Sequence, residues 1–247
     1  MTKYIDRYYL NWELYGIKFA EPGWQLWANT IAYYPLNWDI DDHKWDYGIS
    51  WTTYNLTAVF GTPTYTTSFE SGKVAFNPQA TGKMQGWCWL QNSNTVWDMG
   101  NWQNFTISFC VKIWTTYNDY MSFITNRYGS NYRYMNSINS SNQFFFHWTS
   151  QYIVSTALIP WTRYNITCAV VNWIYTIYIN WTSVETWSYT VWSRTPWLIN
   201  IGFGYYATDN NTYDERMNWC ISEIIIDADG WDATKALDRA KYLGFAN

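Results

Sequence analysis

The chain has 247 residues, of which 48% are hydrophobic and 14% charged, and its formal net charge is −4. An acidic chain without a basic patch does not favour nucleic acid or an anionic membrane as a partner. No apolar run reaches the roughly 18 residues of a membrane-spanning helix, and no signal peptide is expected from the N-terminal sequence. The length and the apolar content fit one large β-domain.

Residues 1–27 are predicted to form an N-terminal β-arm ahead of a main domain at residues 28–247. Side chains alternate over Tyr4–Asn11, and a second short run covers Glu13–Phe19, which favours two short strands joined by a tight turn. Pro22 and Gly23 then end the pattern. Two interpretations stay open: a hairpin that pads the main domain, or an arm that docks on a partner.

The main domain is predicted to consist of antiparallel strands. Phe105–Ile113 is the clearest, because apolar and polar side chains alternate along it. One face should therefore pack on a core, and the other should meet solvent or a second layer. Runs of β-branched and aromatic residues predict the other strands: Thr30–Leu36, Asn55–Phe60, Lys73–Asn77, Tyr120–Thr125, Tyr132–Asn136, Gln143–Trp148, Ile166–Val171, Ile174–Ile179, Leu198–Phe203 and Cys220–Ile226.

The C-terminus changes from the period of a strand to the period of a helix. Asp232 is a suitable N-cap for a helix over Ala233–Leu243, in which Ala236 and Ala240 fall on one face. Gly244 stands where such a helix would stop. This is the one helix that we expect in the chain.

Several motifs carry a family resemblance. Trp161 opens a strand, Tyr178-Ile179-Asn180 stands at a hairpin, and Ile221–Ile226 forms a late strand. These motifs, together with the opening strand Ala32–Leu36, resemble the laminin G-like, concanavalin A-like jelly-roll domain, as found in phage and other viral structural proteins. The resemblance implies an all-β, antiparallel two-sheet jelly-roll sandwich, here with an N-terminal β-arm and a short C-terminal helix. The same sandwich hosts lectins, adhesins, enzymes and structural modules.

Catalysis is not expected. Relatives with this fold that cleave glucans carry acidic residues at alternate positions of one strand, and glycoside hydrolysis needs two carboxylates around the bond. No glutamates of this chain have that spacing, and Glu223 and Asp227 lack a third acidic partner. His43 and His147 match no catalytic triad.

Two loops are candidates for a glycan site, Thr125–Tyr134 and Gly204–Arg216, and the second carries the residues best suited to it. The resemblance implies such a site, because lectins of this family bind sugars at loop ends through aromatic stacking and through Asn and Asp hydrogen bonds. The alternative is an ordinary solvated loop. The candidate ligand-binding residues are Tyr205, Tyr206, Asp209, Asn210, Asn211 and Asp214.

No cofactor is expected other than a structural calcium ion, which many family members hold near an early loop. Ca²⁺ prefers several oxygen ligands, which Asp39, Asp41 and Asp42 would supply. Asp209 and Asp214 are the alternative set. The four cysteines lack the Cys-x-x-Cys spacing of a zinc site, and a disulfide among them stays open.

Several of the 20 tryptophans stand where glycine is expected. Trp38, Trp181 and Trp219 each follow Asn where the family usually has glycine, and Trp12 and Trp161 also fall at turn-like positions. Tight hairpin turns need positive φ, which glycine adopts freely and tryptophan does not. One hypothesis is codon reassignment, because UGA encodes glycine in some recoded bacteria and their viruses and tryptophan in another code. The rival is a tryptophan-rich surface that binds sugars.

These features predict a non-enzymatic virion surface protein, such as a capsid decoration, fibre or tail-associated module. We expect it outside cells or on the virion surface, without a signal peptide. Residues 1–27 would contact other virion proteins, and a homo-oligomer is expected. The alternative is a carbohydrate-binding lectin or adhesin that recognises host or cell-surface glycans.

Overall fold

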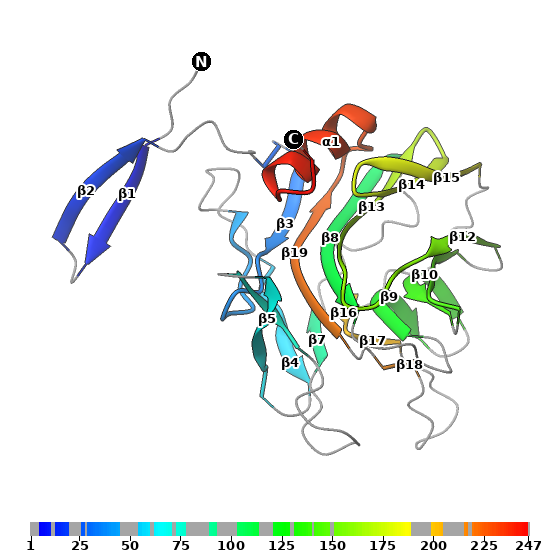
Figure 1. The fold of residues 1–247 in the computed structure, drawn as a ribbon, viewed down its shortest axis with the longest axis horizontal. Helices are drawn as coiled ribbons and strands as arrows, with labels where there is room; N and C mark the ends of the chain where they lie inside the picture. Colours follow the sequence, from blue (N-terminus) through cyan, green and yellow to red (C-terminus); the bar gives the residue numbers. More distant parts are fainter. Residues whose placement is uncertain are drawn as a thin grey trace.

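The computed structural model describes residues 5–10, 13–19, 26–27, 29–44, 54–59, 62–70, 73–77, 89–92, 103–113, 121–128, 131–139, 141–148, 151–188, 199–204, 215–216 and 219–246. Within these ranges the chain forms two large antiparallel sheets and one short helix (Figure 1). None of the described helical segments has the length and apolar character that crossing a membrane requires. The expectation of an all-β, two-sheet sandwich is therefore confirmed.

The first large sheet has eight strands. They are β3 (Thr30–Tyr34), β5 (Tyr65–Glu70), β6 (Lys73–Phe76), β8 (Phe105–Ile113), β13 (Arg163–Val171), β14 (Ile174–Ile179), β15 (Thr182–Ser188) and β19 (Trp219–Asp227). Their order is β15-β14-β13-β8-β19-β6-β5, and β3 also pairs with β19. Strands from both ends of the sequence thus meet at the centre of this sheet.

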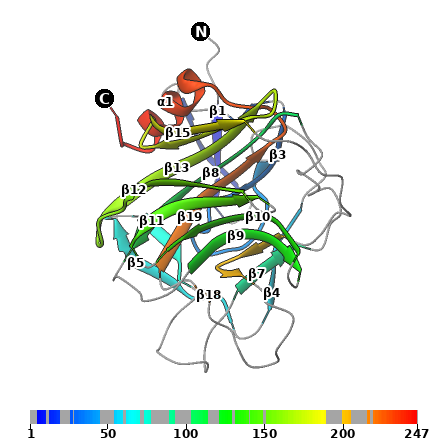
Figure 2. The ribbon, with the colours of Figure 1, turned by 90° about the vertical axis from the view of Figure 1, so that its right-hand side faces the viewer.

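The second large sheet has seven strands and lies across the sandwich from the first (Figures 1 and 2). They are β4 (Thr57–Val59), β7 (Trp89–Asn92), β9 (Met121–Tyr128), β10 (Asn131–Ile138), β11 (Gln143–Trp148), β12 (Gln151–Ala157) and β16 (Ile199–Ile201). Their order is β12-β11-β10-β9-β16-β7-β4.

Two short strand pairs complete the β structure of the described residues. At the N-terminus, β1 (Ile5–Leu10) pairs antiparallel with β2 (Glu13–Phe19), as the alternation predicted. Figure 1 shows this hairpin standing apart from the sandwich. The second pair is β17 (Phe203–Gly204) with β18 (Glu215–Arg216). The division of the chain into residues 1–27 and 28–247 stays a prediction.

The main core lies between the two large sheets. The apolar side of β8, from Phe105 to Ile113, is completely buried there. Its Phe109 ring lies 5.6 Å from Phe123 of β9 and 6.3 Å from Phe144 of β11, measured between ring centroids. Aromatic pairs at these separations add to the stabilisation from burial itself. The apolar face that results from the alternation in β8 thus packs against the second sheet and stabilises the sandwich.

The other face of the eight-stranded sheet is covered by the C-terminal helix α1 (Ala233–Tyr242) and the segment before it. Asp232 caps the helix as predicted, since its Oδ1 accepts a bond from the amide of Lys235 at 2.9 Å. Trp231 and Ala236 are completely buried in a second apolar cluster on this face. The second side of β8 therefore meets a second layer and not solvent.

Gly230 lets this second layer approach the sheet closely. A Cβ atom at this position would lie 2.1 Å from the carbonyl oxygen of Val170 in β13, well inside van der Waals contact. Only glycine fits where two backbones come this near.

The sequence patterns missed several strands. They gave no indication of β5, β7, β12 or β15, and they merged β16 and β17 into one strand. Strand β15 is mostly exposed, so it lacks the one-sided apolar alternation of a packed strand. Gly202, with φ of 85°, interrupts the chain between β16 and β17.

Three cysteines lie in these layers as free, buried thiols: Cys110, Cys168 and Cys220. Burial raises the pKa of each thiol to about 12. No disulfide therefore joins any two of the three, and Cys88 lies outside the described residues.

Candidate functional site

The predicted glycan site lies outside the described residues. Tyr205, Tyr206, Asp209, Asn210, Asn211 and Asp214 all fall between residues 205 and 214. The strands on either side of them, β17 and β18, pair antiparallel through Phe203 with Arg216 and Gly204 with Glu215. The six candidates thus belong to one segment whose two ends meet next to the seven-stranded sheet. Their role in binding stays a prediction.

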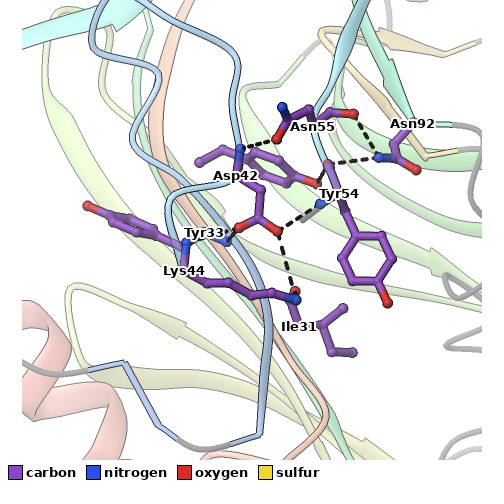
Figure 3. A network of polar contacts seen from close by, with 8 residues as sticks. Ile31, Tyr33, Asp42, Lys44, Tyr54, Asn55 and Asn92 are labelled. Carbon is purple, nitrogen blue, oxygen red and sulfur yellow. Dashed lines mark hydrogen bonds and ion pairs between the residues drawn. The ribbon is translucent and has the colours of Figure 1, made fainter. Parts of the chain in front are cut away.

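The predicted calcium ligands lie in the loop after β3, where Asp42 is completely buried. Figure 3 shows the polar network around its carboxylate. Oδ1 accepts bonds from the backbone amides of Tyr33 and Lys44 at 3.0 and 3.1 Å. Oδ2 accepts the amide of Tyr54 at 3.0 Å and lies 3.9 Å from the Lys44 ammonium. Both oxygens are therefore occupied by groups of the protein itself, from β3 and from the loop that follows it.

Lys44 and Tyr34 lie in the same buried polar network as Asp42. The Lys44 ammonium lies 4.4 Å from the centroid of the Tyr54 ring and donates to the carbonyl of Ile31. Burial lowers the pKa of Lys44, and the nearby Asp42 carboxylate opposes this shift. Burial, reinforced by Asp42 and Tyr54, raises the pKa of the Tyr34 hydroxyl well above its ordinary value. Tyr34 donates to the carbonyl of Tyr54 at 2.6 Å.

Two asparagines extend this network to the opposite sheet. The side-chain oxygen of Asn55 accepts the amide of Asp42 at 3.0 Å. Asn92 of β7 donates from Nδ2 to the carbonyls of Tyr54 and Asn55 at 2.8 and 2.9 Å (Figure 3). The loop after β3 is thereby tied to both sheets. No feature of the sequence identified Lys44 or Tyr54 as partners of Asp42, or Asn92 as a partner of Tyr54 and Asn55.

The two other predicted calcium ligands, Asp39 and Asp41, have contacts different from those of Asp42. Asp39 Oδ1 lies 2.9 Å from His43 Nε2 and accepts the amide of Asp41 at 3.2 Å, whereas Asp41 is exposed. Within the described part of the chain, no three His, Cys, Asp or Glu side chains are grouped so as to hold a metal ion. The donor geometry around Asp42 does not fit a calcium site, and the ion stays an untested expectation.

The acidic residues of β19 are also held in structural contacts. Glu223 Oε2 accepts the Tyr33 hydroxyl at 2.9 Å and lies 3.0 Å from the Arg239 guanidinium of α1. Asp227 accepts the amide of Asp229 at 2.8 Å and the indole N–H of Trp231 at 3.2 Å. Burial raises the pKa of the Asp227 carboxyl, and the bonds from these two residues oppose the shift. These carboxylates position the helix layer on the sheet.

No family model matches the chain. No curated protein matches it either.

Solved structures do share the fold. One is a structure of botulinum neurotoxin type C, whose cell entry is described as dependent upon interaction with two ganglioside molecules. It is 13% identical, with a TM-score of 0.65 over 89% of this chain and 52% of that chain. The botulinum neurotoxin serotype D/C VPI 5993 binding domain is 15% identical, with a TM-score of 0.65 over 87% of this chain and 52% of that one. The chain thus spans about half the length of these neurotoxin structures.

A third structure matches over nearly its whole length. Domain 4 of AbnA, a GH43 extracellular arabinanase from Geobacillus stearothermophilus, in complex with arabinotriose, is 13% identical, with a TM-score of 0.62 over 86% of this chain and 98% of that chain. Together these likenesses establish a β-sandwich fold. At this identity they concern the fold alone.

Proposed function

We propose that this protein is a non-enzymatic, lectin-like binding module that recognises glycans. The observation that supports this proposal best is the shared sandwich: structures with this fold include a neurotoxin domain described with gangliosides and an arabinanase domain in complex with arabinotriose. Since a fold hosts many functions, the proposal also needs a site on this chain. The virion structural role that the sequence favours first is therefore proposed second.

The segment 205–214 is the part of the chain best suited to hold a sugar. Its three tyrosines include the candidates Tyr205 and Tyr206, whose rings can stack on a sugar face, and its four Asp or Asn side chains can bond to hydroxyl groups. Sugar sites need this combination because each sugar presents an apolar face and a polar rim. The acidic residues Asp42 and Glu223 of the described region already accept bonds from neighbouring groups of the protein.

A glycan array followed by titration of the best glycans tests the proposal. We expect saturable binding, and a loss of about tenfold or more in affinity when Tyr205→Ala and Tyr206→Ala are combined, since each tenfold corresponds to about 1.4 kcal/mol. Tyr242→Ala is the matched control, because this tyrosine is 44% exposed on α1, a different element of the fold. A folded protein that binds no glycan on the array overturns the proposal.

A second proposal concerns where the module is displayed. The β1–β2 hairpin stands apart from the sandwich in Figure 1, and an isolated two-stranded hairpin is at best marginally stable in water. A partner surface would stabilise it. We propose that residues 1–27 attach the module to a virus particle, with the sandwich facing outward as a decoration, fibre or tail-associated module.

Deleting residues 1–27 tests this attachment. Particles assembled with the truncated protein should lose it during sedimentation, whereas the truncated sandwich should keep its glycan binding. Retention of the truncated protein on particles would contradict attachment through the arm.

A further inference from the structure

Four tryptophans occupy backbone conformations that tryptophan rarely adopts. Their φ angles are positive: 120° at Trp38, 66° at Trp161, 66° at Trp173 and 72° at Trp181. Positive φ brings the Cβ atom of an L-residue against its own backbone, so a bulky residue there is a genuine outlier. Glycine has no Cβ atom and adopts these angles without strain.

Two of the four belong to tight hairpin turns. Asn172-Trp173 connects β13 to β14 as a two-residue loop, since Val171 pairs with Ile174. Asn180-Trp181 connects β14 to β15 in the same way, since Ile179 pairs with Thr182.

In both loops the two central residues have positive φ, 48° and 66° in the first and 47° and 72° in the second. This is the type I′ turn, whose preferred sequence is Asn-Gly. Both loops therefore have the asparagine of that sequence and lack its glycine.

Trp38 has the most restrictive backbone of the set. Its φ of 120° lies beyond the small left-handed region that Asn and Asp enter, in a part of conformational space that belongs to glycine. Its ring is 64% exposed, and its one described aromatic neighbour is Tyr65, 5.8 Å away between ring centroids. Trp161 is similarly 63% exposed. Little packing of these rings compensates for the backbone they require.

Other tryptophans behave in the opposite way. Trp231 is completely buried, its indole N–H donates to Asp227 at 3.2 Å, and its ring meets that of Trp27 edge to face at 4.6 Å. Neither residue is among the described positions of positive φ. Glycine at Trp231 would leave a large cavity in the layer between α1 and the sheet. These six tryptophans thus fall into two structural classes, four with positive φ and two, Trp27 and Trp231, packed together without it.

We propose that Trp38, Trp161, Trp173 and Trp181 are glycines in the protein as its own host makes it, whereas Trp27 and Trp231 are true tryptophans. A codon such as UGA, read as glycine in the host and as tryptophan under another code, produces this mixture, because ordinary tryptophan and glycine codons are read alike in both. The four indoles are then absent from the surface and take no part in ligand binding.

This assignment sharpens the expectation from the sequence. Trp38, Trp161 and Trp181 remain among the tryptophans that stand where glycine is expected, and Trp173 is added to them. Trp219 does not stand at a turn, since it is the first residue of β19 and pairs with Ile113. Trp12 lies outside the described residues.

Peptide sequencing of the protein from its natural source tests the proposal directly. Cleavage after Arg163 and Arg194 gives a peptide that contains positions 173 and 181, and cleavage after Arg216 and Lys235 gives one that contains position 231. We expect glycine at 173 and 181, tryptophan at 231, and an intact mass below 29.5 kDa. Tryptophan at 173 and 181 overturns the proposal.

A recombinant series gives an independent test. Trp173→Gly and Trp181→Gly should each lower the unfolding equilibrium constant of the chain by roughly fivefold or more, through relief of the left-handed backbone. Trp231→Gly, the matched control, should raise that constant strongly by leaving a cavity. Equal or lower stability of both turn variants would contradict the assignment.

Discussion

The two faces of the eight-stranded sheet are covered in different ways, although the same strands build both. On the face toward the second sheet, β8 presents an apolar row that includes Ile107 and Phe109. On the face toward α1, its Ser108 lies 2.8 Å from the Thr167 hydroxyl and accepts a bond from Asn165 at 3.1 Å. One side is stabilised by apolar area, and the other combines smaller apolar clusters with directed polar contacts.

This difference changes how each face should respond to mutation. Apolar burial is non-directional and scales with the area removed from water. A buried hydrogen bond or ion pair contributes modestly when complete, yet removal of one partner leaves the other unsatisfied. Stability should therefore fall most when a side chain on the face toward the second sheet loses volume. On the face toward α1, it should fall most when a polar side chain loses its bonding partner.

The largest effect is expected from lost volume at the inner face. Ile107→Ala should lower the free energy of unfolding by about 2–5 kcal/mol, because Ile107 is completely buried between the sheets. The matched control is Ile174→Ala on β14, where the side chain is 48% exposed and a change within about 0.5 kcal/mol is expected. Urea unfolding measures both. Equal losses of free energy of unfolding in the two variants would show that packing between the sheets is not the main source of stability.

The same contrast explains what the sequence could predict. The alternation from Phe105 to Ile113 reproduces the observed β8, and the capping residue Asp232 marks the start of α1. Period-two and period-3.6 patterns report which face is apolar. They carry no information on which distant polar groups meet, so neither Arg239 with Glu223 nor Asp42 with Asn55 was foreseen. The candidate glycan site rests on a family resemblance, and its residues lie outside the described ranges.

The next effect concerns the ion pair that joins α1 to β19. Arg239→Ala should lower the free energy of unfolding by about 2–3 kcal/mol, since Arg239 is completely buried and both its bonds to Glu223 are lost. Replacing both residues, with Arg239→Met and Glu223→Gln, should recover part of the loss because no uncompensated charge remains. If the double variant loses more free energy of unfolding than the two single variants together, the ion pair does not stabilise the fold.

A smaller effect is expected at the helix N-terminus. Asp232→Ala should cost about 1 kcal/mol of stability, because it removes the bond to the amide of Lys235. Asp238→Ala is the control, since Asp238 is exposed in the interior of the same helix and alanine has the higher helix propensity. Thermal unfolding of both variants measures the difference. A loss at Asp238 as large as that at Asp232 would contradict the capping role.

The smallest expected effect concerns the layer formed by α1 and the segment before it. The question is whether this layer opens while the rest of the sandwich stays folded. Cys168 faces the inner core, whereas Cys110 and Cys220 lie under the end of the helix layer beside Leu243. In the folded chain these thiols are buried and their pKa values are raised to about 12, so alkylation near neutral pH requires an opening that exposes them. If the helix layer opens by itself, Cys110 and Cys220 will be alkylated before Cys168.

The capping variant Asp232→Ala should then speed alkylation of Cys110 and Cys220 by about fivefold, the factor that corresponds to roughly 1 kcal/mol, and leave Cys168 nearly unchanged. Tryptic peptides separate Cys110, Cys168 and Cys220 from one another, and fragment-ion mass spectrometry separates Cys110 from Cys88, which lies in the same peptide of residues 84–112. Parallel acceleration at all three cysteines would mean that both faces are lost in one cooperative step. The outer layer would then be as much a part of the folding unit as the inner core.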